Sequence, residues 1–260
     1  MTLHRITRRG LLVVGVAGVA GLGIALPVRA DLRQLVAQAK PSVLPIGTYA
    51  ATDSPRFGFR GTGFVVGDGN QLVTNFHVLP PSAEVDSGPR MAVLIPRGRE
   101  GELRMARVQS TDRLRDLALL RFEGSPLAPL PLAEPELAAE GSSVALIGFP
   151  IGGVLGFSPV THRGIISAVT SIVLPAATAQ QLSARAVSSL RAGPFQIYQL
   201  DAVAYPGNSG GPVFDTLSGK VVGVINMVLV RGTRESALTN PTGISYAIPV
   251  RYVRELLDQR

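Results

Sequence analysis

Residues 205–214 of the chain, "YPGNSGGPVF", place one serine hydroxyl among glycines, a composition that suits neither a packed strand nor a helix. Glycine adopts turn conformations that are closed to other residues, and it lets the backbone approach a ligand closely. If Ser209 is a nucleophile, the amides of Gly207 and Ser209 can point together at a developing oxyanion, with Asn208 between them. We therefore predict a nucleophile at Ser209 and an oxyanion site at Gly207, Asn208 and Ser209. The alternative is a glycine-rich β-turn that contains an incidental serine.

A serine nucleophile needs a general base to take its proton, and the chain offers only three histidines, His4, His77 and His162. His4 lies in the N-terminal targeting segment. His162 opens a predicted strand, where we expect a solvated or hydrogen-bonded histidine. His77 in "QLVTNFHVLP" ends an apolar strand and begins a turn, so its side chain can face a cleft. We therefore predict that His77 is the base.

The third member of such a site is a carboxylate that fixes the imidazole tautomer and stabilises its positive charge. Asp116 opens "DLALLRF", an apolar run that will be buried, and a carboxylate at the mouth of a buried strand needs a polar partner such as an imidazole N–H. Asp68, Asp86 and Asp112 lie in polar turns and are predicted to form those turns. Asp201 in "YQLDAVAY" is the alternative, and we expect it to serve the second half of the protein near the site.

The order of these residues along the chain separates two kinds of serine hydrolase. The stretch "GNSGG" also satisfies the G-x-S-x-G pattern of α/β-hydrolases, in which the histidine follows the serine. No histidine follows Ser209, which excludes that arrangement. The order His77, Asp116, Ser209 is the order of chymotrypsin-type enzymes, which are built on two β-barrels.

The elements that must position these residues are mostly short strands. From residue 41 to residue 249, runs rich in Val, Ile and Leu recur between Gly, Pro, Asp and Asn turns, which favours antiparallel all-β barrels or sandwiches. Apolar residues at helical spacing predict a short helix before this region and another after it. We divide the chain into a signal peptide at 1–30, a helical segment at 31–40, a first β-barrel at 41–123, a connection at 124–141, a second β-barrel at 142–249 and a C-terminal helix at 250–260 packed on the second barrel.

The first 30 residues combine a basic start, an uncharged run of 16 residues from Leu11 to Leu26, and "VRA" before Asp31. These are the three regions of a secretory signal peptide, and the paired arginines of "TRRGLL" indicate the twin-arginine export route. The alternative is an uncleaved anchor, although a spanning helix needs about 18 or more apolar residues. In both cases we expect the folded protein in the periplasm or secreted, and at a membrane only if the segment stays uncleaved.

Composition excludes several other classes of function. The formal net charge is +7, but four of the positive charges are arginines in the first 30 residues and the remaining arginines are scattered, so we expect no nucleic-acid partner. The chain has no cysteine, which excludes disulfides and thiol chemistry. Hydrophobic residues make up 46% of the chain, enough for the core of one large domain or two small ones.

Together these motifs resemble the trypsin-like serine proteases, and more narrowly the HtrA (Deg) family of exported bacterial proteases. The similarity runs from about Leu35 to Leu257 and rests on "GTGFVVGDGNQLVTNFHVL", "RDLALLRF", "IGFPIG", "RGIISAV", "QLDAVAYPGNSGGPVFD", "VVGVINM" and "GISYAIPV". The resemblance implies two six-stranded antiparallel β-barrels and endopeptidase activity on unfolded or misfolded proteins. It further implies Ser209 as nucleophile, His77 as general acid and base, Asp116 as the residue that orients it, and no metal or organic cofactor.

Two features depart from the family pattern. Only 11 residues follow Pro249, so we expect no PDZ domain of the kind that many members carry. This leaves open whether the chain forms a homo-oligomer, such as the trimer of its relatives. The loop between Val173 and Phe195 is rich in Ala, Ser and Gln, and whether it orders the oxyanion turn is also open.

Substrate preference is predicted from the residues around the expected primary pocket. In the trypsin-like arrangement the base of this pocket lies six positions before the nucleophile, which is Val203 in this chain. A basic substrate side chain would need a carboxylate there, because an unpaired buried charge is costly. We therefore expect a preference for small or medium aliphatic side chains, with Asn226 and Ser245 near the pocket.

Two other functions stay open from the sequence. The first is a binding or scaffold protein that keeps the protease fold but holds its serine loop inactive. The second is an esterase of small molecules, which is weaker because the same site can accept esters without being built for them.

Overall fold

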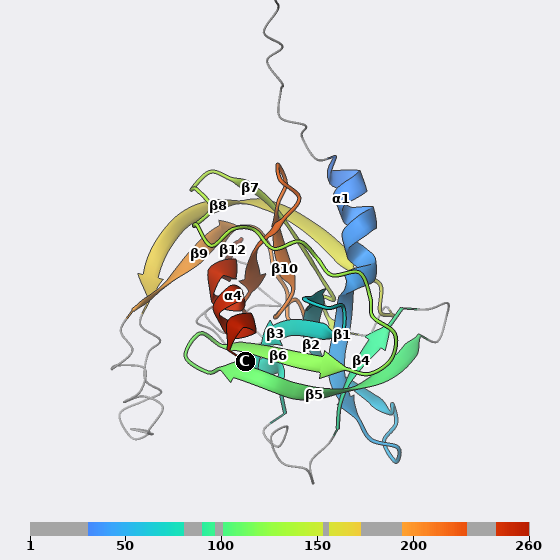
Figure 1. Ribbon diagram of the computed structural model, residues 1–260. Helices are drawn as coiled ribbons and strands as arrows, with labels where there is room; N and C mark the ends of the chain where they lie inside the picture. Colours follow the sequence, from blue (N-terminus) through green and yellow to red (C-terminus); the bar gives the residue numbers. More distant parts are fainter. Residues whose placement is uncertain are drawn as a thin grey trace, which may run out of the picture.

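The computed structural model describes residues 31–80, 90–96, 101–152, 156–172, 194–227 and 243–259. Within these ranges the strands form two closed six-stranded barrels whose neighbouring strands are antiparallel (Figure 1). The predicted all-β fold of two six-stranded barrels is therefore confirmed. The predicted signal peptide, Asp86 and the segment 173–193 of the Ala-rich loop lie outside the described residues.

The first barrel brings the predicted histidine and aspartate to the same end of two neighbouring strands. Its strand order is β1-β2-β3-β6-β5-β4, so β3 and β6 are neighbours although they are far apart in sequence. Their antiparallel register pairs Asn75, at the end of β3, with Leu117, at the start of β6. The residues that follow β3 and precede β6 must therefore meet. The strands are β1 (Val43–Tyr49), β2 (Phe57–Val66), β3 (Gln71–Asn75), β4 (Arg90–Ile95), β5 (Glu102–Asp112) and β6 (Leu117–Phe122).

The second barrel positions the serine loop between the ends of two strands. Its order is β10-β11-β12-β9-β8-β7, and β10 pairs with β11 on one side and β7 on the other. The loop before β10 therefore lies next to the residues that follow β7 and β11. The strands are β7 (Ser143–Gly148), β8 (Val160–Ile172), β9 (Phe195–Asp201), β10 (Pro212–Asp215), β11 (Val221–Ile225) and β12 (Ile244–Pro249).

Each barrel has its own apolar core, and a third apolar cluster joins them. The first core includes Leu44, Leu72 and Leu120, and the second is built around Tyr198. The joining cluster takes buried side chains from both barrels and from both helices. Burial of such side chains stabilises a fold by about 1.5–3 kcal/mol each. The two barrels are thus packed on each other rather than only tethered. Members of the joining cluster include Leu35, Phe64, Val73, Phe149, Phe214 and Val253.

The helix predicted at the start of the described chain is α1 (Leu32–Ala39). The carboxylate of Asp31 caps it by accepting a hydrogen bond from the amide of Arg33 at 3.0 Å. A short 3₁₀ helix follows at Lys40–Ser42, where Pro41 ends the regular α-helix. No helix in the described ranges is long and apolar enough to cross a membrane.

The C-terminal helix α4 (Val250–Asp258) contacts both barrels, whereas the sequence placed it on the second barrel alone. It packs against β5 and β6 of the first barrel as well as β11 and β12 of the second (Figure 1). Arg115 of the first barrel forms an ion pair with Glu255 at 3.0 Å, and its guanidinium lies 4.3 Å from the ring centroid of Tyr252. The polar side of the helix therefore also contacts the first barrel, through Glu255.

Candidate active site

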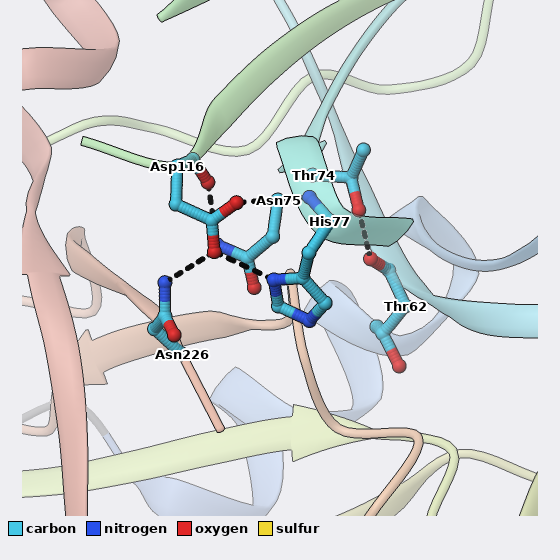
Figure 2. A network of polar contacts seen from close by, with 6 residues as sticks. All are labelled: Thr62, Thr74, Asn75, His77, Asp116 and Asn226. Atoms are coloured by element: carbon cyan, nitrogen blue, oxygen red, sulfur yellow. Dashed lines mark hydrogen bonds and ion pairs between the residues drawn. The ribbon is translucent and has the colours of Figure 1, made fainter. Parts of the chain in front are cut away.

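The structure joins His77 and Asp116 at the boundary between the two barrels (Figure 2). His77 lies in a 3₁₀ turn, Phe76–Val78, directly after β3, and Asp116 directly precedes β6. Nδ1 of His77 is 2.6 Å from Oδ2 of Asp116, and the backbone amide of His77 donates to Oδ1 at 2.8 Å. The two carboxylate oxygens thus hold both the imidazole ring and the backbone of the same histidine.

The backbone of Asp116 has an unusual conformation that allows these contacts. Its φ of 57° lies in the left-handed region, which aspartate tolerates better than most residues. Its carbonyl oxygen accepts from the amide of Phe76 at 3.0 Å and from the side-chain amide of Asn75 at 3.1 Å. Such conformations persist where surrounding contacts hold them, and they gather at functional sites. Here three consecutive residues, from the last residue of β3 to His77, hold Asp116.

Asn226 supplies a third donor to the carboxylate from the other barrel. It directly follows β11, is 1% exposed, and its Nδ2 donates to Oδ2 of Asp116 at 2.7 Å (Figure 2). The sequence placed Asn226 near the substrate pocket and missed this contact. One signal was present, because Asn226 ends a buried apolar strand, as Asp116 begins one. The same need for a polar partner applied to both residues.

The serine loop needs glycine at two positions for reasons that the structure makes explicit. Gly207 and Gly210 have φ values of 102° and 86°, which residues other than glycine rarely adopt. A methyl group at Gly207 would lie 2.2 Å from the carbonyl oxygen of Phe149, and one at Gly210 would lie 2.2 Å from that of Thr62. Any side chain at either position would push the loop away from its neighbours.

The amide of Gly207 has no hydrogen-bond acceptor in the part of the chain that the structure describes, although the peptide unit to which it belongs is fixed. The carbonyl oxygen of that unit, on Pro206, accepts from the amide of Ile151 at 2.8 Å. Because a trans peptide is planar, the N–H of Gly207 points away from this contact. Ile151 itself has a φ of 62°, a conformation that costs energy for a β-branched residue.

The amide of Ser209 also has no acceptor among the described residues. The carbonyl oxygen of its peptide unit, on Asn208, accepts from the amide of Gly211 at 2.9 Å. The amide of Asn208 itself donates to the carbonyl oxygen of Tyr205 at 3.0 Å. Of the predicted oxyanion residues, Gly207 and Ser209 therefore keep available amides, and Asn208 contributes only the link between them.

Ser209 lies against the first barrel beside the histidine turn. Its carbonyl oxygen accepts from the amide of Thr62 at 2.9 Å. A methyl group at Gly61 would lie 3.1 Å from that same oxygen and 2.7 Å from Cγ2 of Val78, the residue after His77. The hydroxyl of Ser209 forms no hydrogen bond with His77 or with any other described residue. Gly61 thus lies next to both Ser209 and the residue that follows His77, and catalytic hydrogen bonds are often long before substrate binds.

The three residues predicted at the substrate pocket differ in exposure. Val203 is partly exposed, whereas Ser245 is fully buried and its hydroxyl donates to the carbonyl oxygen of Ala202 at 2.9 Å. Asn226 is held by Asp116, as described above. Of the three, Val203 alone presents surface to a ligand. No three His, Cys, Asp or Glu side chains gather in a metal-binding arrangement within the described ranges.

Asp68, Asp112 and Asp201, the other acidic residues considered from the sequence that the structure describes, form no hydrogen bond with His77. Asp68 caps the turn after β2 through the amide of Asn70 at 3.0 Å, and its hydrogen bond with Arg121, at 2.7 Å, lowers its pKa. Asp112 binds the backbone and side chain of Arg115, at 3.0 and 2.8 Å. Both therefore serve turns. The alternative carboxylate, Asp201, ends β9 and is exposed.

His162 lies on β8 near the base of the serine loop. Its ring centroid is 5.7 Å from that of Tyr205, and its Nε2 is buried with no hydrogen-bond partner among the described residues. Burial lowers the pKa of His162 below its usual value of 6.5. The sequence predicted a solvated or hydrogen-bonded histidine here, and the structure instead has a half-buried ring packed on an aromatic neighbour.

We expect His162 to make the folded state less stable in acid. As the pH falls below 6.5, the unfolded chain binds a proton that the folded chain resists, so the free energy of unfolding falls. One proton limits this effect to about 1.4 kcal/mol per pH unit, and solvent screening of a half-buried ring keeps it smaller. Urea unfolding at pH 7 and pH 5 should show a smaller pH effect in His162→Phe than in the parent protein. Equal pH effects in both proteins would contradict this assignment.

The order His, Asp, Ser on two packed antiparallel barrels, with a His–Asp pair at their boundary and two loop amides that lack an acceptor among the described residues, is the arrangement of the chymotrypsin-type class of serine peptidases. A family model described as a trypsin-like peptidase domain matches residues 61–224, more than half of the chain. The chain therefore belongs to the trypsin-like peptidase family.

Relatives of the chain carry the name probable periplasmic serine endoprotease DegP-like. The chain is 30% identical over 199 residues to the one from Pseudomonas fluorescens, which is 76% of this chain and 34% of the relative. It is 29% identical over 215 residues to that of a Marinomonas species, covering 83% and 38%, and 30% identical over 203 residues to that of Halomonas elongata, covering 76% and 34%. The chain thus spans about a third of the length of these relatives. The predicted resemblance to exported bacterial proteases is confirmed.

Proposed function

We propose that the chain is a serine endopeptidase that cleaves peptide bonds through Ser209, His77 and Asp116. The single observation that carries this proposal is the pair of loop amides, Gly207 and Ser209, that lack an acceptor among the described residues and lie beside the bonded His77 and Asp116. Two alternate amides next to a histidine that is paired with a buried carboxylate support an oxyanion-binding role for this turn.

In the first half of the reaction, Oγ of Ser209 bonds to the carbonyl carbon of the substrate and its proton passes to Nε2 of His77. The electron pair of the carbonyl moves onto its oxygen, which the amides of Gly207 and Ser209 bind. Asp116 keeps the other imidazole proton on Nδ1 and stabilises the imidazolium. His77 then gives its new proton to the leaving amine as the C–N bond breaks, which leaves an acyl ester on Ser209.

In the second half, water repeats these steps in place of serine. His77 takes a proton from the water as its oxygen bonds to the acyl carbon, and the same two amides bind the oxyanion. Collapse of this intermediate breaks the ester bond, and His77 returns the proton to Oγ of Ser209. The products are a free carboxylic acid and the regenerated hydroxyl, so no group beyond water is consumed.

The substrate and the location are inferred from the relatives and from the site. Those relatives are named periplasmic endoproteases, which supports proteins as substrates and an exported chain. We infer a preference for unfolded or misfolded chains, and for an aliphatic substrate side chain beside Val203, which is partly exposed. Export by the twin-arginine route rests on the sequence of the first 30 residues alone.

A fluorophosphonate probe tests the proposal directly, because it forms a stable bond only with an activated serine. We expect one probe per chain, located on Ser209 by peptide mass analysis, together with cleavage of casein by the same preparation. Heat-denatured protein is the control and should take up no probe. Absence of labelling in the folded protein would overturn the proposal and favour a scaffold protein. Labelling with ester hydrolysis but without casein cleavage would favour a small-molecule esterase.

A further inference from the structure

Thr62 of β2 binds the second barrel at three points around the serine loop. It is fully buried, and its hydroxyl donates to the carbonyl oxygen of Gly207 at 2.6 Å. The same hydroxyl accepts from the amide of Phe149 at 3.1 Å, and the backbone amide of Thr62 donates to the carbonyl oxygen of Ser209 at 2.9 Å. One residue of the first barrel therefore binds the loop on both sides of Asn208.

The hydroxyl of Thr62 holds the peptide unit that separates the two free amides. This unit consists of the carbonyl of Gly207 and the amide of Asn208, and the amide is held by Tyr205 at 3.0 Å. Among the described residues, Thr62 is the sole partner of the Gly207 carbonyl. Rotation of this unit would change the backbone angles at the α-carbons of Gly207 and Asn208. Without the bond to Thr62, the described contacts would hold this unit through Tyr205 alone, and the two flanking amides would lose the link that fixes their relative orientation.

Contacts from other elements direct the hydroxyl proton of Thr62 toward Gly207. The amide of Phe149 can only donate, so the oxygen of Thr62 accepts on that side and its own proton faces the loop. The carbonyl oxygen of Thr62 accepts from the hydroxyl of Thr74 at 2.7 Å, on the strand that leads to His77 (Figure 2). Thr62 is thereby fixed between the histidine strand and the serine loop.

We propose that Thr62 is a positioning residue for the oxyanion site, and that its hydroxyl keeps the amides of Gly207 and Ser209 converging on one point. The inference rests on the proposed function, because it concerns the same two donors. Valine has the same shape and would suit a buried strand equally well. The hydroxyl is therefore required by the loop rather than by the packing of β2.

Replacement of Thr62 by valine and by serine separates positioning from packing. In Thr62→Val we expect kcat for peptide hydrolysis to fall about 10- to 100-fold, less than the 10²- to 10³-fold typical of losing an oxyanion donor itself. KM should stay within about twofold, because ground-state binding does not use the oxyanion site. Fluorophosphonate labelling should slow in parallel. Thr62→Ser keeps the hydroxyl and should restore kcat to within about threefold of the parent protein.

Ser42→Ala is the matched control. It also removes a buried hydroxyl that donates to a distant carbonyl, at Ala128 with a distance of 2.6 Å, but it lies outside the serine loop. We expect Ser42→Ala to lower stability while kcat stays near that of the parent protein. If Ser42→Ala and Thr62→Val lost activity alike, or if Thr62→Val kept full kcat, the positioning role would be overturned.

Hydrogen exchange supplies a readout that does not depend on activity. The backbone amides of residues 205–214 should exchange faster in Thr62→Val than in the parent protein. In Ser42→Ala their exchange rates should equal those of the parent protein. Unchanged exchange in Thr62→Val would overturn the inference even if the enzyme is active. A parent protein that neither cleaves casein nor takes up the probe would overturn the proposed function, and faster exchange in Thr62→Val would then still support Thr62 as the residue that fixes the loop.

Discussion

Replacing either Ser209 or His77 by alanine is expected to lower kcat for peptide hydrolysis about 10⁶-fold, and replacing both is expected to cost no more than either alone. Each residue is useless without the other, because the hydroxyl is a poor nucleophile until the imidazole takes its proton. The residual rate should remain about 10³- to 10⁴-fold above that in water, since the amides of Gly207 and Ser209 and substrate binding are retained.

The double variant tests the spatial relation on which the mechanism depends. In the structure the Ser209 backbone contacts Thr62 beside the histidine turn, but the hydroxyl forms no hydrogen bond with His77 among the described residues. We would measure initial rates on a peptide substrate at pH 8 for the two single variants and the double variant. The rates show whether the two side chains act together. Additive losses would show that the two side chains act independently. Asp112→Asn, a variant of a residue that forms no hydrogen bond with His77 or Ser209 among the described residues, should keep activity close to that of the parent protein at this pH.

The sequence was sufficient for those parts of the protein that depend on local patterns. Short apolar runs between turn residues favoured all-β barrels or sandwiches, the connection at 124–141 divided them into two groups, and helical spacing predicted α1 and α4. His77 was chosen from the three histidines because it ends an apolar strand at a turn, and Asp116 because a carboxylate at the mouth of a buried strand needs a polar partner. The antiparallel pairing of β3 with β6 then places those two mouths together, and the structure joins the two side chains at 2.6 Å.

The features that the sequence did not reveal depend on how the two barrels pack. The bond from Asn226 to Asp116 spans 110 residues, and the bond from Thr62 to Gly207 spans 145. Neither follows from spacing or composition, because each requires the closure of both barrels and one particular orientation between them. The position of α4 has the same cause, since its polar face meets a barrel that is distant in sequence. Local propensity cannot encode such contacts.

Replacing Asp116 by asparagine is expected to lower kcat about 10⁴-fold while the fold is retained. All three groups that face this carboxylate act as donors: Nδ1 of His77 and Nδ2 of Asn226 face Oδ2, and the backbone amide of His77 faces Oδ1. The side-chain NH₂ of an asparagine must occupy the position of either Oδ1 or Oδ2, and it then faces a donor in both cases. The backbone amide of His77 cannot become an acceptor, so the new amide nitrogen is expected at the position of Oδ2.

That orientation forces the wrong tautomer on His77. Nδ1 must accept from the new amide, so the imidazole proton moves to Nε2, the nitrogen that should take the proton of Ser209. Asn226 can adapt by turning its carbonyl oxygen toward the new donor, which is why stability should change far less than activity. Peptide hydrolysis and urea unfolding, measured together, test this expectation. A variant that lost stability in proportion to activity would instead assign Asp116 a structural role.

Asp112→Asn is the matched control for this change, because it makes the same substitution four residues earlier in the same segment. The carboxylate of Asp112 accepts from both the backbone amide and the guanidinium of Arg115. The variant therefore loses an ion pair at a turn but keeps every contact of the imidazole. We expect it to keep kcat within about twofold of the parent protein and to lose about 1 kcal/mol of stability or less, as is usual for partly exposed ion pairs. Comparable losses of kcat in the two variants would show that charge anywhere in this segment, rather than the donor geometry at Asp116, sustains the reaction.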